Sequence, residues 1–252
     1  MAELGRVTAA VLIIGDEILS GRTQDTNLNF IARFLATYGV DVAEARVVPD
    51  IEAEIIAALD ALRARNDYVI TTGGIGPTHD DITADCVAKA FGVPLEENEE
   101  ILSTMRARWG AEPNPAHRRM ARVPVGGELV RNAVQGPPGF CIGNVFVLAG
   151  VPAIMRGMME DVGHRMRPGA VVVARTLRVE GVGESLMAAP LERVAKAHQS
   201  LSMGSYPFYN ADGYGSNLVV RGRDAEGVAA AMDELEAALQ GLGARAITRV
   251  DA

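Results

Sequence analysis

The sequence predicts an α/β protein in which a three-layer α/β/α domain is followed by a smaller α+β domain. Three strand-then-helix units succeed one another from Val7 onwards, and this alternation predicts a mostly parallel sheet with helices on both of its faces. Pro168-Gly169 then interrupts the pattern, and the order of strands and helices changes after it. We therefore expect one domain over residues 1–168 and a second over residues 169–252.

The first strand is a nearly continuous apolar run at Val7–Ile14, which is typical of a strand covered on both faces. Apolar residues at spacings of three and four predict the helices, and Gly39 supplies a C-terminal stop for the first of them. The elements predicted up to the end of the third strand are a strand at 7–14, a helix at 27–38, a strand at 40–48, a helix at 51–65 and a strand at 67–71.

An excursion from the sheet follows the third unit. A helix is predicted at 96–109, and the prolines of Glu112–Pro115 end it before a second, short helix at 116–121. Two more strands, at 129–130 and 144–149, are separated by Gly136–Phe140, whose composition predicts a constrained loop. A helix at 152–165 completes the first domain.

The second domain has its own order of elements. The same periodicities predict a strand at 171–179, a helix at 184–197, strands at 202–206 and 216–221, a helix at 225–239 and a last strand at 246–250. Two long helices and four strands in this order predict a small α+β domain.

Composition and charge exclude several classes of function. A net charge of −8 argues against a broad nucleic-acid-binding surface. The longest apolar runs fall far below the roughly 20 residues that cross a bilayer, and no signal peptide precedes them, so we expect a cytoplasmic protein without membrane contact. The two cysteines, Cys86 and Cys141, show no zinc-ligand or disulfide spacing, and buried thiols are expected.

The most informative segment is Thr71–Thr83, which joins the third strand to a helix predicted to begin near Ile82. Glycines at 73, 74 and 76 permit close approach of a ligand to backbone N–H groups, and the helix directs its positive end toward an anion. The sequence therefore predicts a phosphate-binding loop. Its expected binding residues are Gly73, Gly74, Ile75, Gly76, Pro77 and Thr78.

Two carboxylates follow this loop, and others lie at the ends of the first two strands. Asp80 and Asp81 would repel a bound phosphate unless a divalent cation lies between them, which indicates Mg²⁺ or another hard ion. We expect Asp16 and Asp81 to hold the metal, and Asp81, Asp50 and Asp80 to be catalytic. Plain structural roles are open for three of them: Asp81 and Asp50 as helix N-caps and Asp16 as a turn residue. Asn27 would contact a ribose or phosphate, or cap the helix that it begins.

Basic residues in the excursion are further candidates. Guanidinium groups suit phosphate recognition, although a solvated surface is the alternative for most of them. Histidines could act as general acid or base, or be structural. The residues concerned are Arg106, Arg108, Arg118, Arg119, Arg122, His79 and His117.

Several motifs point to a known family. They are Gly15–Gly21, Asp25–Asn27, Val48–Asp50, Thr71–Thr78 and Asp80–Thr83. Together they resemble the MoaB/Mog-type molybdopterin-binding domain. With Gly136–Phe140 and Leu148–Pro152, they are most similar to the N-terminal domain of the competence/damage-inducible CinA type, over residues 7–165. Gly181–Ser185 and Gly204–Pro207 look like the small KH-like domain that follows in that type.

This resemblance implies a site that handles a pyrophosphate or a pterin, and we expect metal-dependent hydrolysis of a nucleotide such as ADP-ribose or FAD. The alternatives are a nucleotidyl- or metal-transfer domain acting on molybdopterin, and a non-catalytic nucleotide-binding module. One position departs from the family pattern, because Ile154 stands where a glutamate is expected. The resemblance also implies a homo-oligomer, with a homodimer as the expected form. We expect no nicotinamide-nucleotide deamidase domain.

Overall fold

The computed structural model describes residues 5–134, 136–211 and 213–250. The chain divides into two compact units, which part between Ala170 and Val171. Each unit has its own hydrophobic core. They are described separately below.

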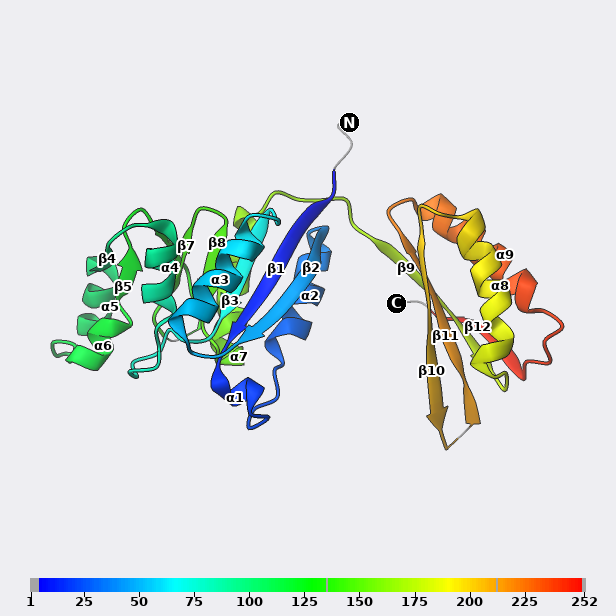
Figure 1. Cartoon of the computed structure of the whole chain (residues 1–252), viewed down its shortest axis with the longest axis horizontal. Helices are drawn as coiled ribbons and strands as arrows, with labels where there is room; N and C mark the ends of the chain where they lie inside the picture. Colours follow the sequence, from blue (N-terminus) through cyan, green and yellow to red (C-terminus); the bar gives the residue numbers. More distant parts are fainter. Residues whose placement is uncertain (1–4, 135, 212, 251–252) are drawn as a thin grey trace. The chain divides into compact units, whose positions relative to one another are not determined.

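The first unit is built on a six-stranded sheet in the order β2-β1-β3-β8-β7-β6 (Figure 1). β2, β1, β3 and β8 run parallel to one another, whereas β7 runs antiparallel to β8 and β6 antiparallel to β7. This confirms the predicted, mostly parallel sheet. The strands are β1 (Val7–Ile14), β2 (Val40–Val48), β3 (Tyr68–Thr72), β6 (Glu128–Val130), β7 (Gly139–Ile142) and β8 (Val145–Leu148).

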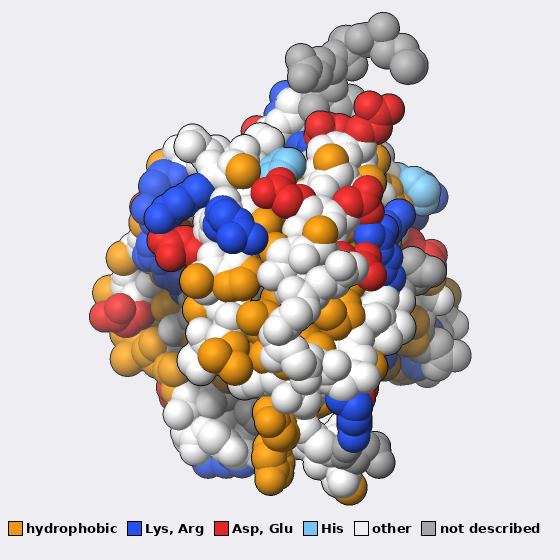
Figure 2. Space-filling model, turned by 90° about the vertical axis from the view of Figure 1, so that its right-hand side faces the viewer, with side chains coloured by type: hydrophobic (Ala, Val, Ile, Leu, Met, Phe, Trp, Pro, Cys, Tyr) orange, Lys and Arg blue, Asp and Glu red, His pale blue; other side chains and the backbone are white. Residues whose placement is uncertain are grey.

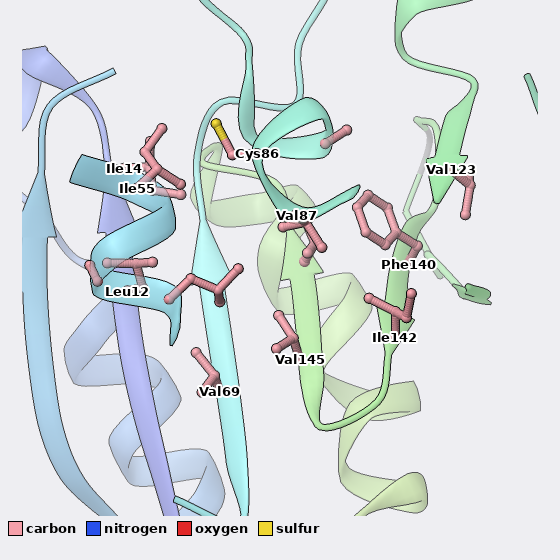
Figure 3. Close-up of a cluster of buried hydrophobic side chains, with 14 of the residues drawn as sticks. Leu12, Ile14, Ile55, Val69, Cys86, Val87, Val123, Phe140, Ile142 and Val145 are labelled. Carbon is pink, nitrogen blue, oxygen red and sulfur yellow. The ribbon is translucent and has the colours of Figure 1, made fainter. Parts of the chain in front are cut away.

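Helices cover both faces of this sheet. Alternate residues of a strand point to opposite faces, so Leu12 and Ile14 of β1 pack with α3 and α4, while Val11 and Ile13 pack with α2 and α7. Figure 3 shows the first of these cores, in which Ile55 and Val87 lie over the sheet. The helices of the unit are α1 (Asp16–Leu19), α2 (Asn27–Thr37), α3 (Glu52–Arg63), α4 (Thr83–Phe91), α5 (Glu99–Trp109), α6 (Pro115–Arg119) and α7 (Pro152–Arg165).

The helices that follow two neighbouring strands of this sheet lie on opposite faces. α2 follows β1 on one face, and α4 follows β3 on the other, although β1 and β3 are hydrogen-bonded neighbours. The carboxyl ends of the two strands therefore border a small cavity, which Ile14 and Thr72 line. Ligands of open α/β sheets bind at such a point.

Some elements differ from the sequence prediction. β7 includes Gly139 and Phe140, which were expected to lie in a constrained loop; the strand begins directly after two prolines, so its start has the composition of a turn. The excursion also contains a two-stranded sheet of β4 (Leu95–Glu97) and β5 (Arg122–Pro124). α1 lies within a segment that was expected to be a loop.

The second unit has the order β9-α8-β10-β11-α9-β12, and its antiparallel sheet has the order β10-β11-β9-β12. This is the split β-α-β arrangement of ferredoxin-like domains, and it confirms the small α+β domain. Figure 2 views the side on which α8 and α9 lie, where hydrophobic side chains gather between charged ones. The elements are β9 (Val173–Glu180), α8 (Glu184–Ala197), β10 (Ser202–Asn210), β11 (Gly213–Gly222), α9 (Ala225–Leu239) and β12 (Ala246–Val250).

Two sequence expectations concern the chain as a whole. Both cysteines are free thiols, and burial raises the pKa of the Cys86 thiol to about 12, so it is not a reactive thiolate. Among the helices in the described ranges 5–134, 136–211 and 213–250, none is long and apolar enough to cross a membrane.

Candidate functional site

The loop that leaves β3 is held in a shape that requires glycine. Gly73 has φ 102°, and a Cβ atom there would lie 2.0 Å from the carbonyl oxygen of Ile14. Gly74 has φ 64°, in the left-handed region. The loop therefore passes against the end of β1 more closely than any side chain would allow.

This loop presents backbone donors that the protein does not use. The N–H groups of Gly74, Ile75 and Gly76 have no acceptor among the described residues, whereas Gly73 N–H donates to Leu148 O at 3.3 Å. Thr83, the first residue of α4, holds the loop by donating from N to Gly74 O and from Oγ1 to Gly73 O. Successive free N–H groups at the start of a helix form a concave anion site.

Asp81 shapes the far end of the loop. Its Oδ2 accepts hydrogen bonds from Thr78 N at 2.8 Å and from the Thr78 hydroxyl. α4 begins after Ile82, which caps it without a side-chain hydrogen bond, so Asp81 is not the N-cap considered from the sequence. Pro77 and Thr78 are exposed between these points.

Arg119 of α6 reaches the same loop. It lines a pocket with Gly74, Ile75, Gly76 and Asp81, and its Nη2 donates to Asp81 O at 3.2 Å. Its Nε is buried and has no acceptor among the described residues. The pocket holds about 20 Å³, room for one water molecule, so a larger group in contact with Arg119 requires the surrounding side chains to move apart.

Other arginines of the excursion have carboxylate partners instead. Arg122 donates to both oxygens of Asp85, at 2.9 and 2.7 Å. Arg118 pairs with Glu97, and Arg106 pairs with Glu99. His117 stacks against Trp109, with ring centroids 4.2 Å apart, and His79 is exposed beside Asp80.

A second group of carboxylates lies at the ends of β1 and β2. Asp50 Oδ2 accepts a hydrogen bond from the backbone N–H of Asp16 at 3.0 Å. The N-cap of α3 is Ile51, without a side-chain bond, so Asp50 does not cap that helix. Burial, together with the carboxylates of Asp16, Glu17 and Asp80, raises the pKa of Asp50. The structure thus links Asp50 to Asp16 by a hydrogen bond, and Glu17 and Asp80 lie near enough to disfavour the ionised form of Asp50.

The expected metal ligands do not form a closed cation site. In the described part of the chain, no three His, Cys, Asp or Glu side chains are arranged to hold a metal ion. Asp16 belongs to the group around Asp50, and Asp81 to the glycine loop. Their oxygen atoms nevertheless have the chemistry that hard divalent cations prefer, and Mg²⁺ is usually held by one or two carboxylates together with phosphate oxygens.

Asn27, the first residue of α2, lines the small cavity at the ends of β1 and β3 and is 5% exposed. Its Nδ2 donates to Gly150 O at 2.8 Å, while its Oδ1 has no partner among the described residues. Thr26 is the N-cap of α2 without a side-chain bond, and the carboxylate of the preceding Asp25 accepts from the backbone N–H groups of Asn27 and Leu28. Asn27 is therefore not the side-chain cap that the sequence left open.

Two neighbours of the site were not expected from the sequence. Thr72, the last residue of β3, has a buried hydroxyl without a partner among the described residues. Gly150 follows β8 and would bring a Cβ to 3.2 Å from Gly73 Cα. A threonine at the end of an apolar strand is a signal that could have identified Thr72. Ile154, in the first turn of α7, packs against the hydrophobic core on the α2 side.

Comparison with known proteins agrees with this architecture. Residues 10–168 match the family described as "Probable molybdopterin binding domain", and residues 172–245 match "FAD synthase, middle domain". A CinA-like protein of Myxococcus xanthus is 35% identical over 209 residues, covering 77% of this chain and 50% of that protein. A CinA-like protein of Citrifermentans bemidjiense is 40% identical over 195 residues, covering 73% and 47%. The chain thus spans about half the length of these relatives.

A solved structure has the same fold. The CinA protein of Thermoplasma acidophilum, titled as having unknown function, is 34% identical, with a TM-score of 0.59. The match covers 63% of this chain and 97% of that chain. The chain therefore belongs to the molybdopterin-binding-domain family, as a CinA-type member.

Proposed function

We propose that the first unit binds a nucleotide that contains a pyrophosphate and hydrolyses it with the help of a divalent cation. The observation that supports this most is a set of unused donors around one pocket. The N–H groups of Gly74, Ile75 and Gly76 and the buried Nε of Arg119 have no acceptors among the described residues. An ionised phosphate offers only acceptors, so it matches this set.

Both sides of the pocket act on the same anion in this proposal. The loop donates from a rigid backbone at the positive end of α4, and Arg119 adds a full charge. The backbone donors of the loop are fixed before the ligand arrives, which favours negative charge, whereas the side chains around Arg119 move apart to admit a phosphate. Thr78 and Asp81 keep the loop in this shape through their hydrogen bonds.

Asp16 and Asp81 are proposed to hold Mg²⁺ or another divalent ion, with phosphate oxygens of the ligand completing its coordination. When bound, the ion supplies Lewis-acid polarisation of the phosphoryl group. The charge around Asp50 supports this assignment, because burial and then the neighbouring carboxylates of Asp16, Glu17 and Asp80 raise the pKa of Asp50. A cation in this region relieves that repulsion.

Asp50 is proposed to accept a proton from the attacking water. A carboxylate positioned beside a cation-bound water can act as its general base. The hydrogen bond from Asp16 N fixes Oδ2, which leaves Oδ1 to face the water. Asp80, which is exposed beside the loop, is proposed to assist by orienting the same water or a cation ligand.

The comparisons bear on both the proposed function and a second candidate. The match of residues 172–245 to the middle domain of FAD synthase supports a nucleotide ligand with a pyrophosphate. The family description of residues 10–168 favours a pterin instead, with nucleotidyl or metal transfer as the activity. A nucleotide and a phosphorylated pterin can both place a phosphate on this loop. Phosphate binding therefore does not separate the two candidates, but the reaction product does.

The test is incubation of the purified protein with ADP-ribose, FAD and NADH in turn, each with Mg²⁺, Mn²⁺ or Co²⁺. Product nucleotides are separated by chromatography. Release of AMP that is lost in Asp81→Asn supports the hydrolase and ranks its substrates. Binding of a ligand without product at every metal ion rejects the hydrolase; co-purification of a fluorescent pterin then assigns the transfer class, and its absence assigns a non-catalytic module.

A further inference from the structure

A second small cavity lies on the other side of the Gly73 turn from Arg119. It holds about 60 Å³ and is bordered by the ends of β1 and β3, the start of α2 and the turn before α7. Thr72 and Gly73 line it, whereas Gly74, Ile75 and Gly76 line the Arg119 pocket. The backbone from Gly73 to Gly74 therefore lies between the two cavities.

Two oxygen atoms at this second cavity are buried without a partner among the described residues. They are Asn27 Oδ1 and Thr72 Oγ1, on side chains 5% and 1% exposed. Leaving a buried polar group unpaired is costly, so native proteins provide a partner for such groups in protein, water or ligand. The Nδ2 atom of Asn27 donates a hydrogen bond to Gly150 O, so Oδ1 is the amide atom that remains for a ligand.

The chemistry of this cavity is opposite to that of the Arg119 pocket. An amide oxygen accepts hydrogen bonds, a hydroxyl donates or accepts, and the lining includes the carboxylate residue Glu17. Among the described residues, no Lys or Arg lines it. A phosphate, which only accepts and is negatively charged, does not suit this side of the crevice.

We propose that the Asn27–Thr72 cavity binds a hydrogen-bond donor of the ligand, a hydroxyl or an N–H group adjoining its phosphate. This inference rests on the proposed function, and it sets the orientation of the ligand across the Gly73 turn. The phosphate lies on the Arg119 side, and the sugar hydroxyl or ring N–H lies on the α2 side. The cavity thus selects phosphate esters that carry such a donor over bare phosphates.

Thr72→Val tests this assignment with little disturbance of the fold. The change keeps the β-branched shape and removes a hydroxyl that makes no hydrogen bond in the described protein. Thr71→Val is the matched control, because Thr71 Oγ1 is also buried without a partner among the described residues. Thr71 lines neither cavity, and its side chain points to the opposite face of the sheet.

The probes are ADP-ribose and inorganic pyrophosphate, each titrated by calorimetry in the presence of Mg²⁺. We expect Thr72→Val to weaken ADP-ribose binding about three- to tenfold, the value of one hydrogen bond. Its affinity for pyrophosphate, which has no sugar, stays at the wild-type value. Thr71→Val keeps the wild-type affinity for both.

The outcomes separate this inference from the proposed function. Equal ADP-ribose affinity in wild type and Thr72→Val, with binding intact, overturns the inference alone and assigns the cavity to water. A parallel loss of pyrophosphate binding in Thr72→Val also overturns it, because the effect is then not specific to a donor. Absence of binding of either probe by the wild-type protein overturns the proposed function, and the orientation with it.

Discussion

Asp50 Oδ2 accepts a hydrogen bond from the backbone N–H of Asp16 at 3.0 Å, and this bond joins the turn after β2 to the turn after β1. The two residues are 34 positions apart in the sequence. Their contact places a partly buried carboxylate beside other acids, which raises its pKa. The hydrogen bond from the backbone of Asp16 holds Asp50 in place, although the carboxylates of the two residues repel each other.

Asp50→Asn is expected to stabilise the unliganded protein at pH 7. The asparagine Oδ1 still accepts from Asp16 N, but the repulsive charge is gone. Because the pKa of Asp50 is raised in the folded state, ionisation of Asp50 destabilises the folded wild-type protein. The wild-type protein therefore has its full stability below the unfolded-state pKa, near 3.8, and loses part of it as the pH rises through the folded-state pKa. The gain of the variant therefore disappears as the pH falls below 3.8.

Urea unfolding at neutral and acidic pH measures this difference. Asp60→Asn is the control, because Asp60 forms an exposed ion pair with Arg63; its effect at pH 7 stays within about 0.5 kcal/mol. A loss of stability in Asp50→Asn at pH 7 contradicts the electrostatic account of the group.

Asp81→Asn is expected to abolish turnover while the fold is kept. The amide oxygen replaces Oδ2 as acceptor for Thr78 N and its hydroxyl, so the loop retains its shape without the charge. Nucleotide product and the unfolding midpoint are measured on the same sample. Wild-type turnover in this variant removes Asp81 from the proposed mechanism.

Arg119→Met is expected to weaken the binding of inorganic pyrophosphate about tenfold or more, because hydrogen bonds to charged groups contribute about 1.5–3 kcal/mol. It leaves the unliganded protein at least as stable, since the variant no longer buries an unpaired Nε. Arg118→Met is the control: Arg118 pairs with Glu97 outside the pocket, and its loss leaves pyrophosphate affinity unchanged. Calorimetric titration gives both affinities, and an equal loss in the two variants indicates a general charge effect.

Gly73→Ala and Gly92→Ala separate backbone strain from steric conflict. Both glycines have positive φ, at 102° and 65°, but a Cβ at Gly92 meets nothing within 4 Å. Gly92→Ala is expected to cost about 1 kcal/mol. Gly73→Ala adds a contact with Ile14 O at 2.0 Å and is expected to cost about 3 kcal/mol or more. Similar unfolding midpoints for the two variants refute the close approach of the loop to β1.

Divalent cations are expected to bind tightly only together with the ligand. The described carboxylates form no group of three that could hold a metal, so phosphate oxygens are needed to complete the coordination. Electron paramagnetic resonance of Mn²⁺ detects free and bound ion. We expect Mn²⁺ to bind in the presence of pyrophosphate and to remain free without it; tight binding without pyrophosphate contradicts the shared-ligand arrangement.

The central sheet could be predicted from the sequence because β1, β2 and β3 are long enough to show their pattern. β4 and β5 could not, since each has three residues and carries no measurable period. The first two residues of β7, Gly139 and Phe140, were expected to lie in a loop because they follow Pro137 and Pro138. In each case a local signal was absent, and pairing with another strand determines the structure.

The site shows a similar division. The glycine loop and the carboxylates at the strand ends follow from residue type and position, but Arg119 could not be distinguished from its neighbours. Arg119 differs from its neighbours because they form ion pairs and it forms none among the described residues. Arg118 pairs with Glu97 and Arg122 with Asp85, which are 21 and 37 positions away in the sequence. The roles of Asp50 and Asn27 likewise depend on partners distant in sequence, Asp16 and Gly150.

A crystal structure of the protein with ADP-ribose and Mg²⁺ tests the central claim most directly. The account predicts that the pyrophosphate lies on the N–H groups of Gly74, Ile75 and Gly76 within hydrogen-bonding distance of Arg119. A ligand bound elsewhere, with these donors still unoccupied, would contradict the assignment of the glycine loop as the phosphate site.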